Sequence, residues 1–302
     1  MTLDSLQQTT PEQVAADFRN AVRAAVSALP EKLRLIGLIA TESAPSLTYS
    51  NYTRAGCDDV GIEFELRHVS RLELETEIER ANADPNAHGI MIYYPVFGTD
   101  RDRYLKDVVD FRKDVEGLTN HWVHRLYANQ RWESYDRTRK AILPCTPLGI
   151  VKILEAVQLP LNLEGGLNLV DLNVAIFNRS EVVGRPLAQM LANDGAQVWS
   201  FDLNGTIEFT KGQERESTVG RAEALKTADI VITGVPNRNF PLIAIDEIPR
   251  ARVRLNFSTV QNFHPNAACA PGVFVPRVGP VTVAMCLRNT LQLYRNFHRP
   301  ES

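Results

Sequence analysis

The chain has 302 residues, more than a single hydrophobic core usually supports, so two domains that share a cleft are expected. Its 44% hydrophobic and 23% charged residues are typical of a globular protein and exclude a disordered or collagen-like chain. The 33 basic and 36 acidic side chains give a formal net charge of -3, which argues against nucleic-acid binding.

The cysteines and the N-terminal residues indicate the compartment. The cysteines lie far apart and form no CxxC pair, which argues against a zinc site and a disulfide framework: Cys57, Cys145, Cys269 and Cys286. The first residues contain no basic segment followed by an apolar one, and no apolar run approaches the ~18 residues of a membrane span. We therefore expect a cytoplasmic protein with no metal site and no membrane partner.

The first half of the chain has the pattern of an α/β domain. Thr10, Pro11 and Gln13 have the spacing of a helix N-terminus. Apolar runs of strand length alternate with helical patterns, as in a buried parallel sheet. The expected elements are a helix from Pro11, a strand from Leu33 (LRLIGLIA), an alternating strand from Ile62 (IEFELRHV), a helix over 73–83 and a strand over 89–95.

A second β/α series follows a polar, aromatic and irregular stretch over 111–139 and a helix over 148–157. Four strands and a last helix are expected: NVAIFN from Asn173, QVWSFD from Gln197, DIVITG from Asp229, VRLNFS from Val253, and a helix opened by Gly279 and Pro280. The predicted fold is α/β with two domains, the second a Rossmann-type doubly wound parallel sheet.

The segment Asn178–Pro186 (NRSEVVGRP) lies where the first strand of this series should turn into a helix. Backbone N–H groups and the helix dipole bind a pyrophosphate at such a turn. The GxGxxG fingerprint is absent, because Gly184 is the only glycine of the segment. An ordinary strand-to-helix turn is the alternative.

Asp202 ends the next strand, close to the offset of roughly 20 residues typical of a ribose-binding acid. Its carboxylate would accept hydrogen bonds from both ribose hydroxyls. A 2′-phosphate ~4 Å away would be repelled by about 4 kcal/mol per unit charge pair at an effective dielectric of ~20, so NAD is favoured over NADP. Arg179 and Arg185 argue the other way, because either could pair with a 2′-phosphate. A solvated strand-end carboxylate is the alternative for Asp202.

The strand that precedes Gly234, Val235 and Pro236 should end at the carboxyl edge of the same sheet, where doubly wound folds bind ligands. We expect these three residues to line the nicotinamide ribose. A plain turn is the alternative.

Four motifs together resemble the methylenetetrahydrofolate dehydrogenase/cyclohydrolase family: PCTP from Pro144, NRSEVVGRP from Asn178, TADIVITGVP from Thr227 and VGPVTVAM from Val278. They occur in the family's order and spacing over nearly the whole chain. The resemblance implies a folate-binding domain over 1–147 that the C-terminal helix, 280–302, rejoins, and a Rossmann-type NAD-binding domain over 148–279. It also implies a tetrahydrofolate one-carbon substrate and a homodimer formed through the cofactor domain.

The resemblance also assigns binding residues. It implies cofactor contacts at Asn178, Arg179, Ser180, Gly184, Asp202, Leu203, Gly234, Val235, Pro236, Asn256 and Phe257. It implies substrate contacts at Tyr49, Thr53, Tyr93, Glu116, Pro276 and Gly279.

The chain departs from the family's active-site pattern at three positions. Tyr49 is kept, but Thr53 stands at the lysine of Tyr-x-x-x-Lys. Tyr93 replaces the glutamine of a Val-Gln-Leu-Pro strand, and Glu116 replaces the second aspartate of Lys-Asp-Val-Asp-Gly. These departures look like the family's monofunctional, NAD-dependent branch.

The two activities of the family require different groups. Hydride transfer requires alignment of substrate and cofactor, whereas cyclohydrolysis requires groups that shuttle protons. Thr53 has no useful pKa for proton transfer. We therefore expect oxidation of 5,10-methylenetetrahydrofolate to 5,10-methenyltetrahydrofolate with NAD, and little or no cyclohydrolase activity.

Candidate catalytic residues are Tyr49, Glu116 and Cys145. The Tyr49 ring is expected to pack against the aromatic middle of the folate, and Glu116 to hydrogen-bond the pterin ring. Cys145, between two prolines, could approach the one-carbon unit, although most buried cysteines are inert. Tyr93 either fills the space left by a missing Gln–Lys pair or acts in catalysis.

Three other functions remain open. A bifunctional enzyme could use Tyr52 or a water in place of the lysine. A folate- or NAD-binding sensor could keep the scaffold without the chemistry. A dehydrogenase for a different small acid is possible on fold alone, since fold does not fix function.

Overall fold

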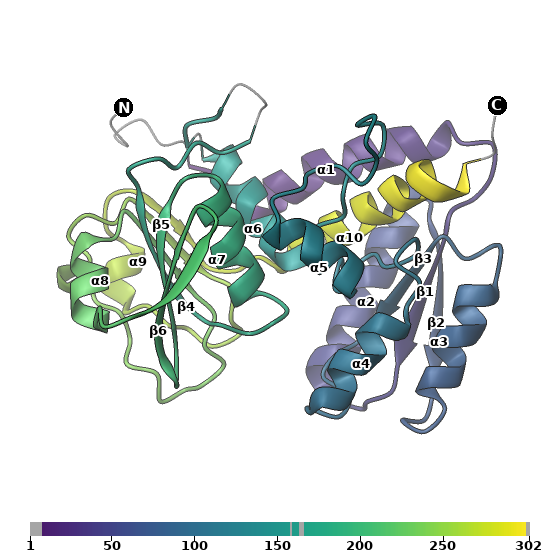
Figure 1. Cartoon of the computed structure of the whole chain (residues 1–302), viewed down its shortest axis with the longest axis horizontal. Coiled ribbons are helices and arrows are strands. Elements are labelled where there is room, and N and C mark those ends of the chain that lie inside the picture. Colours follow the sequence, from purple (N-terminus) through teal and green to yellow (C-terminus); the bar gives the residue numbers. More distant parts are fainter. Residues whose placement is uncertain (1–7, 158, 163–165, 300–302) are drawn as a thin grey trace. The chain divides into compact units, whose positions relative to one another are not determined.

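The computed structural model describes residues 8–157, 159–162 and 166–299. Residues 1–7, on which the expected absence of a targeting segment depends, lie outside this part. The chain divides into two compact units (Figure 1). The three-stranded unit comprises Ala15–Leu126, Gln130–Cys145 and the chain from Thr282 onward. The seven-stranded unit comprises the chain up to Val14, Tyr127–Asn129 and Thr146–Val281.

The three-stranded unit has a small parallel sheet of order β2-β1-β3. Its strands are β1 (Arg34–Ile39), β2 (Glu63–His68) and β3 (Gly89–Ile92). The helices that lie wholly or largely in this unit are α1 (Pro11–Ser27), α2 (Ala44–Val60), α3 (Leu74–Ala83), α4 (Asp100–Val108), α5 (Asn120–Tyr127) and α10 (Gly279–Leu293), which a π-helical turn, Tyr294–His298, follows.

Apolar side chains of the central strand form a core with α3 and α4. Ile36 and Leu38 of β1 belong to one buried cluster with Ile78 and Leu105. Elsewhere in the unit, α2 approaches α10 closely because Gly56 has no side chain; a Cβ there would come within 2.8 Å of Val283.

The predicted start of the first helix is confirmed. The Gln13 backbone N–H donates to the Thr10 hydroxyl (3.2 Å), and the Thr10 backbone N–H donates to the Gln13 side-chain oxygen (3.0 Å). The strands expected from Leu33, Ile62 and residue 89 are confirmed as β1, β2 and β3. The stretch expected to be irregular contains α5, whose buried Trp122 and Leu126 fix it against the unit.

The seven-stranded unit has the strand order β10-β9-β8-β4-β5-β6-β7. Its strands are β4 (Asn173–Phe177), β5 (Gln197–Asp202), β6 (Gly205–Thr210), β7 (Gln213–Ser217), β8 (Ile230–Thr233), β9 (Val253–Asn256) and β10 (Val273–Val275). Its helical elements are α6 (Cys145–Ala156), α7 (Gly184–Asn193), α8 (Arg221–Thr227), the 3-10 turn Ile245–Glu247 and α9 (Pro265–Ala268).

Strand β4 pairs in parallel with β5 on one side and with β8 on the other. The connections from β4 therefore run in opposite directions, and the crevice at this switch point is where doubly wound sheets bind ligands. The predicted α/β fold with a Rossmann-type sheet is confirmed, as are the four strands expected in it. The antiparallel strands β6 and β7 and the short β10 were not predicted.

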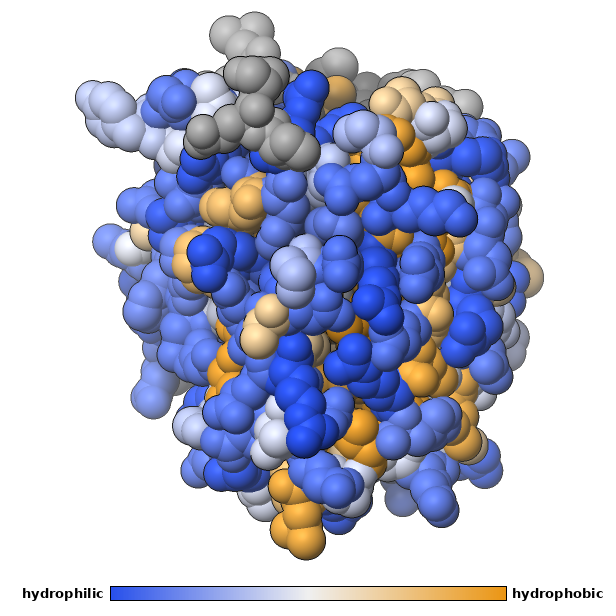
Figure 2. Space-filling view, turned by 90° about the vertical axis from the view of Figure 1, so that its right-hand side faces the viewer, coloured by the Kyte–Doolittle hydropathy of each residue, from blue (hydrophilic) through white to orange (hydrophobic). Residues whose placement is uncertain are grey.

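Within the described ranges, no helix is both long enough and apolar enough to cross a membrane. Hydrophilic side chains predominate on the face seen in Figure 2, with apolar atoms visible mainly in narrow strips between them. Such a distribution is ordinary for a globular surface.

Candidate functional site

Five of the residues predicted to bind or act on a substrate lie together in the three-stranded unit. We call them the Tyr49 cluster: Tyr49 and Thr53 on α2, Tyr93 directly after β3, Glu116 in the loop before α5, and Cys145 at the start of α6. The rings of Tyr49 and Tyr93 meet edge to face with centroids 5.9 Å apart. Burial, followed by the charges that Cys286, Cys145 and Glu116 can carry, raises the pKa of Tyr49.

Thr53 and Tyr93 provide no group that titrates near neutral pH. Thr53 is fully buried, and its hydroxyl donates to the Tyr49 backbone carbonyl one turn earlier (3.0 Å). Burial raises the pKa of Tyr93. The Thr53 side chain lies beside the buried Tyr93 hydroxyl and opposes this rise in pKa, although the two hydroxyls do not form a hydrogen bond of good geometry.

The loop that carries Glu116 is built around the buried Asp114 carboxylate. This carboxylate accepts hydrogen bonds from four backbone N–H groups, at 2.7–3.0 Å, of Glu116, Gly117, Leu118 and Thr119. Burial raises the pKa of Asp114, and these hydrogen bonds, which favour the charged form, offset that rise only in part. The neighbouring Lys113 is structural, because its ammonium donates to three backbone carbonyls at the end of α3.

Glu116 accepts fewer hydrogen bonds than Asp114. Its carboxyl is buried and accepts one hydrogen bond, from the Ile92 backbone N–H (3.3 Å). Burial and then the charge of Asp114 raise the pKa of Glu116 to about 8. At neutral pH Glu116 is therefore mainly a neutral acid that can both donate and accept a hydrogen bond.

Cys145 is held as a thiol. Its Sγ donates to the Val115 carbonyl (3.2 Å), and the Asn289 side-chain nitrogen lies 3.6 Å from it. A hydrogen bond with Cys286, followed by burial, raises the pKa of Cys145. The thiolate is the nucleophilic form of cysteine, so these surroundings favour a packing role over a direct one.

The residues predicted to bind a cofactor lie in the seven-stranded unit, at the carboxyl ends of β4, β5, β8 and β9. The Asn178 side chain donates to the Gly234 carbonyl (2.8 Å) and so joins the ends of β4 and β8. The Ser180 hydroxyl accepts from the backbone N–H groups of Val183 (3.2 Å) and Gly184 (3.4 Å). A Cβ at Gly184 would overlap the Asn178 carbonyl, which explains the single glycine of this turn.

Both arginines near the predicted ribose site are paired with carboxylates. Arg179 forms a two-pronged ion pair with Asp202, with Nε 3.0 Å from Oδ2, and also donates to the Ser200 and Gly205 carbonyls. Arg185 pairs with Glu214 (2.7 Å) and with Glu181 on the preceding turn.

Three further predicted cofactor residues, Leu203, Asn256 and Phe257, lie after β5 or at the end of β9. Leu203 is fully exposed on the turn after Asp202. Asn256 links three carbonyls, including that of Pro276 (3.5 Å), and its side-chain oxygen accepts from Thr233. The ring of Phe257 fills the space that a Cβ on Gly234 would occupy.

Val235 is held on both sides by the buried Asn262, whose side chain accepts from the Val235 N–H (3.0 Å) and donates to its carbonyl (3.1 Å). Pro236 follows at the same sheet edge. Pro276 and Gly279 belong to the seven-stranded unit rather than to the unit of the Tyr49 cluster.

Several residues beside the predicted ones were missed from the sequence. Cys286 and Asn289 of α10 contact the Tyr49 cluster, Tyr94 places a buried hydroxyl near Glu116, and Asn262 holds Val235. One signal was available, because Asn289 is a polar residue within a mainly apolar helix.

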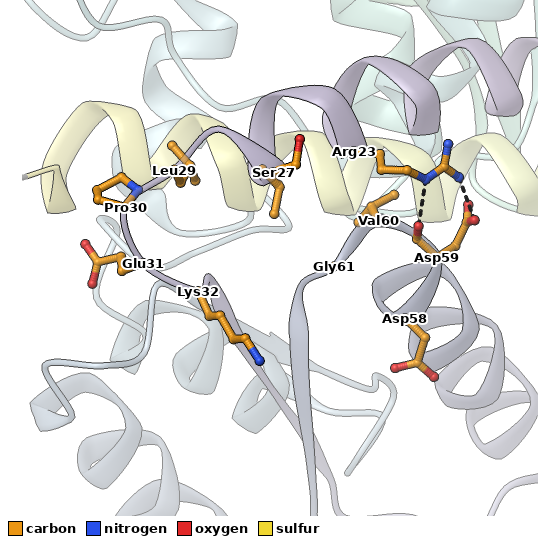
Figure 3. Close-up of a pocket in the computed structure, with 11 residues that line it drawn as sticks. Arg23, Ser27, Leu29, Pro30, Glu31, Lys32, Asp58, Asp59, Val60 and Gly61 are labelled. Carbon is orange, nitrogen blue, oxygen red and sulfur yellow. Dashed lines mark hydrogen bonds and ion pairs between the residues drawn. The ribbon is translucent and has the colours of Figure 1, made fainter.

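A separate pocket of about 510 Å³ lies beside the ends of α1 and α2 (Figure 3). Its lining includes an exposed ion pair of Arg23 with Asp59, and Lys32 and Asp58 stand at its edge. No residue of the Tyr49 cluster lines it, so this pocket is not the candidate active site. Within the part described, no group of three or more His, Cys, Asp or Glu side chains is placed to hold a metal ion.

Comparisons with known proteins agree with the geometry. Residues 10–116 match the profile "Tetrahydrofolate dehydrogenase/cyclohydrolase, catalytic domain", and residues 144–250 match the NAD(P)-binding domain of the same family. A methylenetetrahydrofolate dehydrogenase [NAD(+)] of Dictyostelium discoideum is 40% identical over 291 residues, covering 94% of this chain and 92% of the relative. A relative of the same description from Saccharomyces cerevisiae is 39% identical over 276 residues, covering 87% and 86%.

Among solved structures, the NAD-dependent 5,10-methylenetetrahydrofolate dehydrogenase of Saccharomyces cerevisiae matches with a TM-score of 0.86 and 35% identity. The match covers 97% of this chain and 98% of that one. The resemblance inferred from the four sequence motifs is thereby confirmed.

Proposed function

The chain belongs to the tetrahydrofolate dehydrogenase/cyclohydrolase family, and from this premise we propose that it oxidises 5,10-methylenetetrahydrofolate to 5,10-methenyltetrahydrofolate with NAD. The observation that carries the proposal is the similarity, over nearly the whole chain, to relatives described as NAD-dependent dehydrogenases of this substrate. When bound, NAD supplies the hydride acceptor. The protein residues bind and align the two reactants.

The turn before α7 fits a dinucleotide. No partner for the backbone N–H groups of Glu181 and Val182 occurs among the described residues, so two donors remain at this helix N-terminus for a pyrophosphate. The exposed Leu203 beside Asp202 offers apolar surface for an adenine ring. These features support the assignment of Asn178, Ser180 and Gly184 to the cofactor site.

The pairing of Arg179 with Asp202 supports NAD over NADP. To bind a 2′-phosphate, Arg179 would have to leave a two-pronged ion pair in which its side chain is only 8% exposed. Arg185 is likewise paired with two carboxylates. Neither arginine is available as a free cation. Asp202 Oδ1 accepts from Arg179 and from the Asn204 backbone N–H, whereas in the described part of the chain Oδ2 accepts only from Arg179 and keeps a lone pair for a ribose hydroxyl.

The Tyr49 cluster suits the folate. We assign the Tyr49 ring to the aromatic middle of the substrate. Glu116, as a neutral acid, can donate to the pterin carbonyl and accept from the adjacent pterin N–H. The Tyr93 hydroxyl, which has no hydrogen bond of good geometry among the described residues, offers a further donor.

The same cluster supports weak or absent cyclohydrolase activity. Thr53 and Tyr93 stand where the family pattern has a lysine and a glutamine, and neither titrates near neutral pH. Purified protein should convert methenyltetrahydrofolate to the 10-formyl form at no more than the spontaneous rate. Hydrolysis well above that rate would contradict this proposal and favour the bifunctional alternative.

The cofactor assignment is tested by comparing NAD with NADP in wild type and in Asp202→Ser. Wild type should produce reduced nicotinamide absorbance with methylenetetrahydrofolate and NAD, which also excludes a silent sensor. Asp202→Ser frees Arg179 and should lower kcat/KM for NAD and raise it for NADP, each by roughly 10-fold, or about 1.4 kcal/mol. Glu223→Gln, at an exposed position of α8 away from the predicted cofactor residues, is the control and should leave both kcat/KM values unchanged. Equal use of both cofactors by wild type would overturn the assignment.

We also propose a homodimer formed through the cofactor domain. Strand β7 is the edge of the seven-stranded sheet, and among the described strands it pairs with β6 alone, so its outer edge can accept a second strand. Sedimentation of the purified protein should give twice the mass of the chain, and the chain mass at all concentrations would contradict the proposal.

A cytoplasmic location is proposed from the cysteines. All four thiols are free, which fits a reducing compartment. Cell fractionation that places the protein in another compartment would contradict this assignment.

A further inference from the structure

Asn289 of α10 connects two separate segments of the three-stranded unit. Its side chain is fully buried. The side-chain nitrogen donates one hydrogen bond to the Val115 carbonyl (2.9 Å) and one to the Leu143 carbonyl (3.0 Å). An amide NH₂ has two hydrogens, so both donors are used.

The two segments carry the acid and the thiol of the Tyr49 cluster. Val115 directly precedes Glu116, and Leu143 lies two residues before Cys145. The segments also touch through their backbones, because a Cβ on Gly117 would come within 2.9 Å of the Leu143 carbonyl carbon. Asn289 therefore links the loop that carries Glu116 to the segment that precedes α6 by two hydrogen bonds.

We propose that Asn289 is a positioning residue for the dehydrogenase reaction, which holds the Glu116 carboxyl in the orientation that the pterin ring requires. The proposal rests on the proposed function, because it assigns Glu116 to the pterin. An asparagine side chain can donate to both carbonyls at once. An ionised aspartate would place its oxygens against the two carbonyls with no hydrogen to donate. Leucine is similar in size to asparagine but cannot donate a hydrogen bond.

The chain offers a matched control in Thr290. It is the next residue of α10, is equally buried, and its hydroxyl donates within the helix to the Cys286 carbonyl (2.9 Å). Its methyl group packs toward Gly89 on β3. Thr290→Val thus removes a buried hydrogen bond from the same helix without touching the Glu116 loop.

The experiment compares Asn289→Leu with Thr290→Val in steady-state kinetics and thermal unfolding. Asn289→Leu should lower kcat/KM for methylenetetrahydrofolate by at least ~10-fold, since the Leu143 carbonyl loses its donor and the Val115 carbonyl keeps only the Cys145 thiol. It should leave KM for NAD within about 2-fold. Thr290→Val should keep both constants within about 2-fold even where it lowers the melting temperature. Asn289→Ser, which keeps one donor, should fall between Asn289→Leu and wild type.

The pH profile separates positioning from simple destabilisation. A released loop admits water to Glu116 and lowers its pKa from about 8 toward the ordinary value. The high-pH decline of kcat/KM for the folate should therefore begin at lower pH in Asn289→Leu and be unchanged in Thr290→Val. The groups that face Glu116 are Asp114 on its own loop, Lys106 on α4, Tyr49 on α2, Tyr93 and Tyr94 after β3, and Cys145 on α6.

The kinetic results distinguish a failure of the positioning role of Asn289 from a failure of the proposed dehydrogenase function. A folate kcat/KM in Asn289→Leu within about 2-fold of wild type, or equal losses for folate and NAD, would overturn the positioning role. Wild type without any dehydrogenase activity would instead refute the proposed function. If Asn289→Leu does not fold, the pH profile of kcat/KM for the folate is measured on Asn289→Ser instead. A profile equal to that of wild type would overturn the proposal.

Discussion

At the scale of single residues, burial raises the pKa of two neighbouring carboxyls, Asp114 and Glu116. Four backbone N–H groups donate to Asp114 and oppose this effect of burial. Glu116 accepts one such bond, and its pKa rises to about 8. Glu116 can therefore donate a hydrogen bond at neutral pH.

The raised pKa of Glu116 predicts how stability depends on pH. The folded protein holds this proton up to pH about 8, whereas the unfolded chain loses it near pH 4.3, so stability falls as pH rises between these values. Glu116→Gln removes this loss and should stabilise the protein at pH 8 but not at pH 4. At ~1.4 kcal/mol per pKa unit the gain is at most about 5 kcal/mol, and relaxation of the loop reduces it.

Urea unfolding at pH 8 and pH 4 measures this difference. The exposed Glu42 supplies the control, and Glu42→Gln should change the free energy of unfolding by less than about 0.5 kcal/mol at either pH. A Glu116→Gln variant that is no more stable than wild type at pH 8 would show that Glu116 is ionised there.

Sequence patterns could place Tyr49, Thr53 and Glu116 in a site because each stands at a recognisable motif position. They could not give the protonation state of Glu116, which depends on burial by residues far along the chain. Asn289 was missed for the same reason, since its partners Val115 and Leu143 are 174 and 146 residues away.

At the scale of elements, the turn between β4 and α7 depends on Gly184. A side chain there would overlap the Asn178 carbonyl, so the helix could not begin so close to the strand. Gly184→Ser should therefore displace the N-terminus of α7, raise KM for NAD by at least ~10-fold and destabilise the protein by about 1–3 kcal/mol.

Gly220 supplies the matched control because it also stands at a helix N-terminus, that of α8, with no atom within 4 Å of its virtual Cβ. Gly220→Ser adds a favoured capping residue and should leave the NAD kinetics unchanged. Equal behaviour of the two variants in NAD titrations and thermal melts would refute the role given to Gly184.

Elements of this sheet were predictable to the extent that they are buried. Strands β4, β8 and β9 are apolar runs, and their order of appearance with helices indicates a parallel sheet. Strand β7 is almost wholly exposed and polar, so nothing in its sequence (QERES) distinguishes it from a loop. Helix α5 could not be predicted from an apolar pattern because only two of its residues, Trp122 and Leu126, are buried.

At the scale of the whole molecule, each unit has its own sheet and its own core. The division crosses α1 after Val14 and α10 after Val281, so the three-stranded unit combines most of the first half of the chain with residues from Thr282 onward. Contacts as distant in sequence as those of Asn289 must form before its core is complete, which slows folding relative to local contacts.

Separate cores predict that NAD alone will protect one unit more than the other. The predicted cofactor residues all lie in the seven-stranded unit, and a ligand at 100 times its Kd stabilises the folded state that binds it by about 2.7 kcal/mol. Amide hydrogen exchange should therefore slow by up to about 100-fold in β4, β5, β8 and β9, with a smaller effect in β1, β2 and β3. Gly184→Ser should lose this protection at the same NAD concentration, whereas Gly220→Ser should keep it. Equal slowing in both sheets would mean that the two units unfold as one cooperative structure and that α1 and α10 couple their cores.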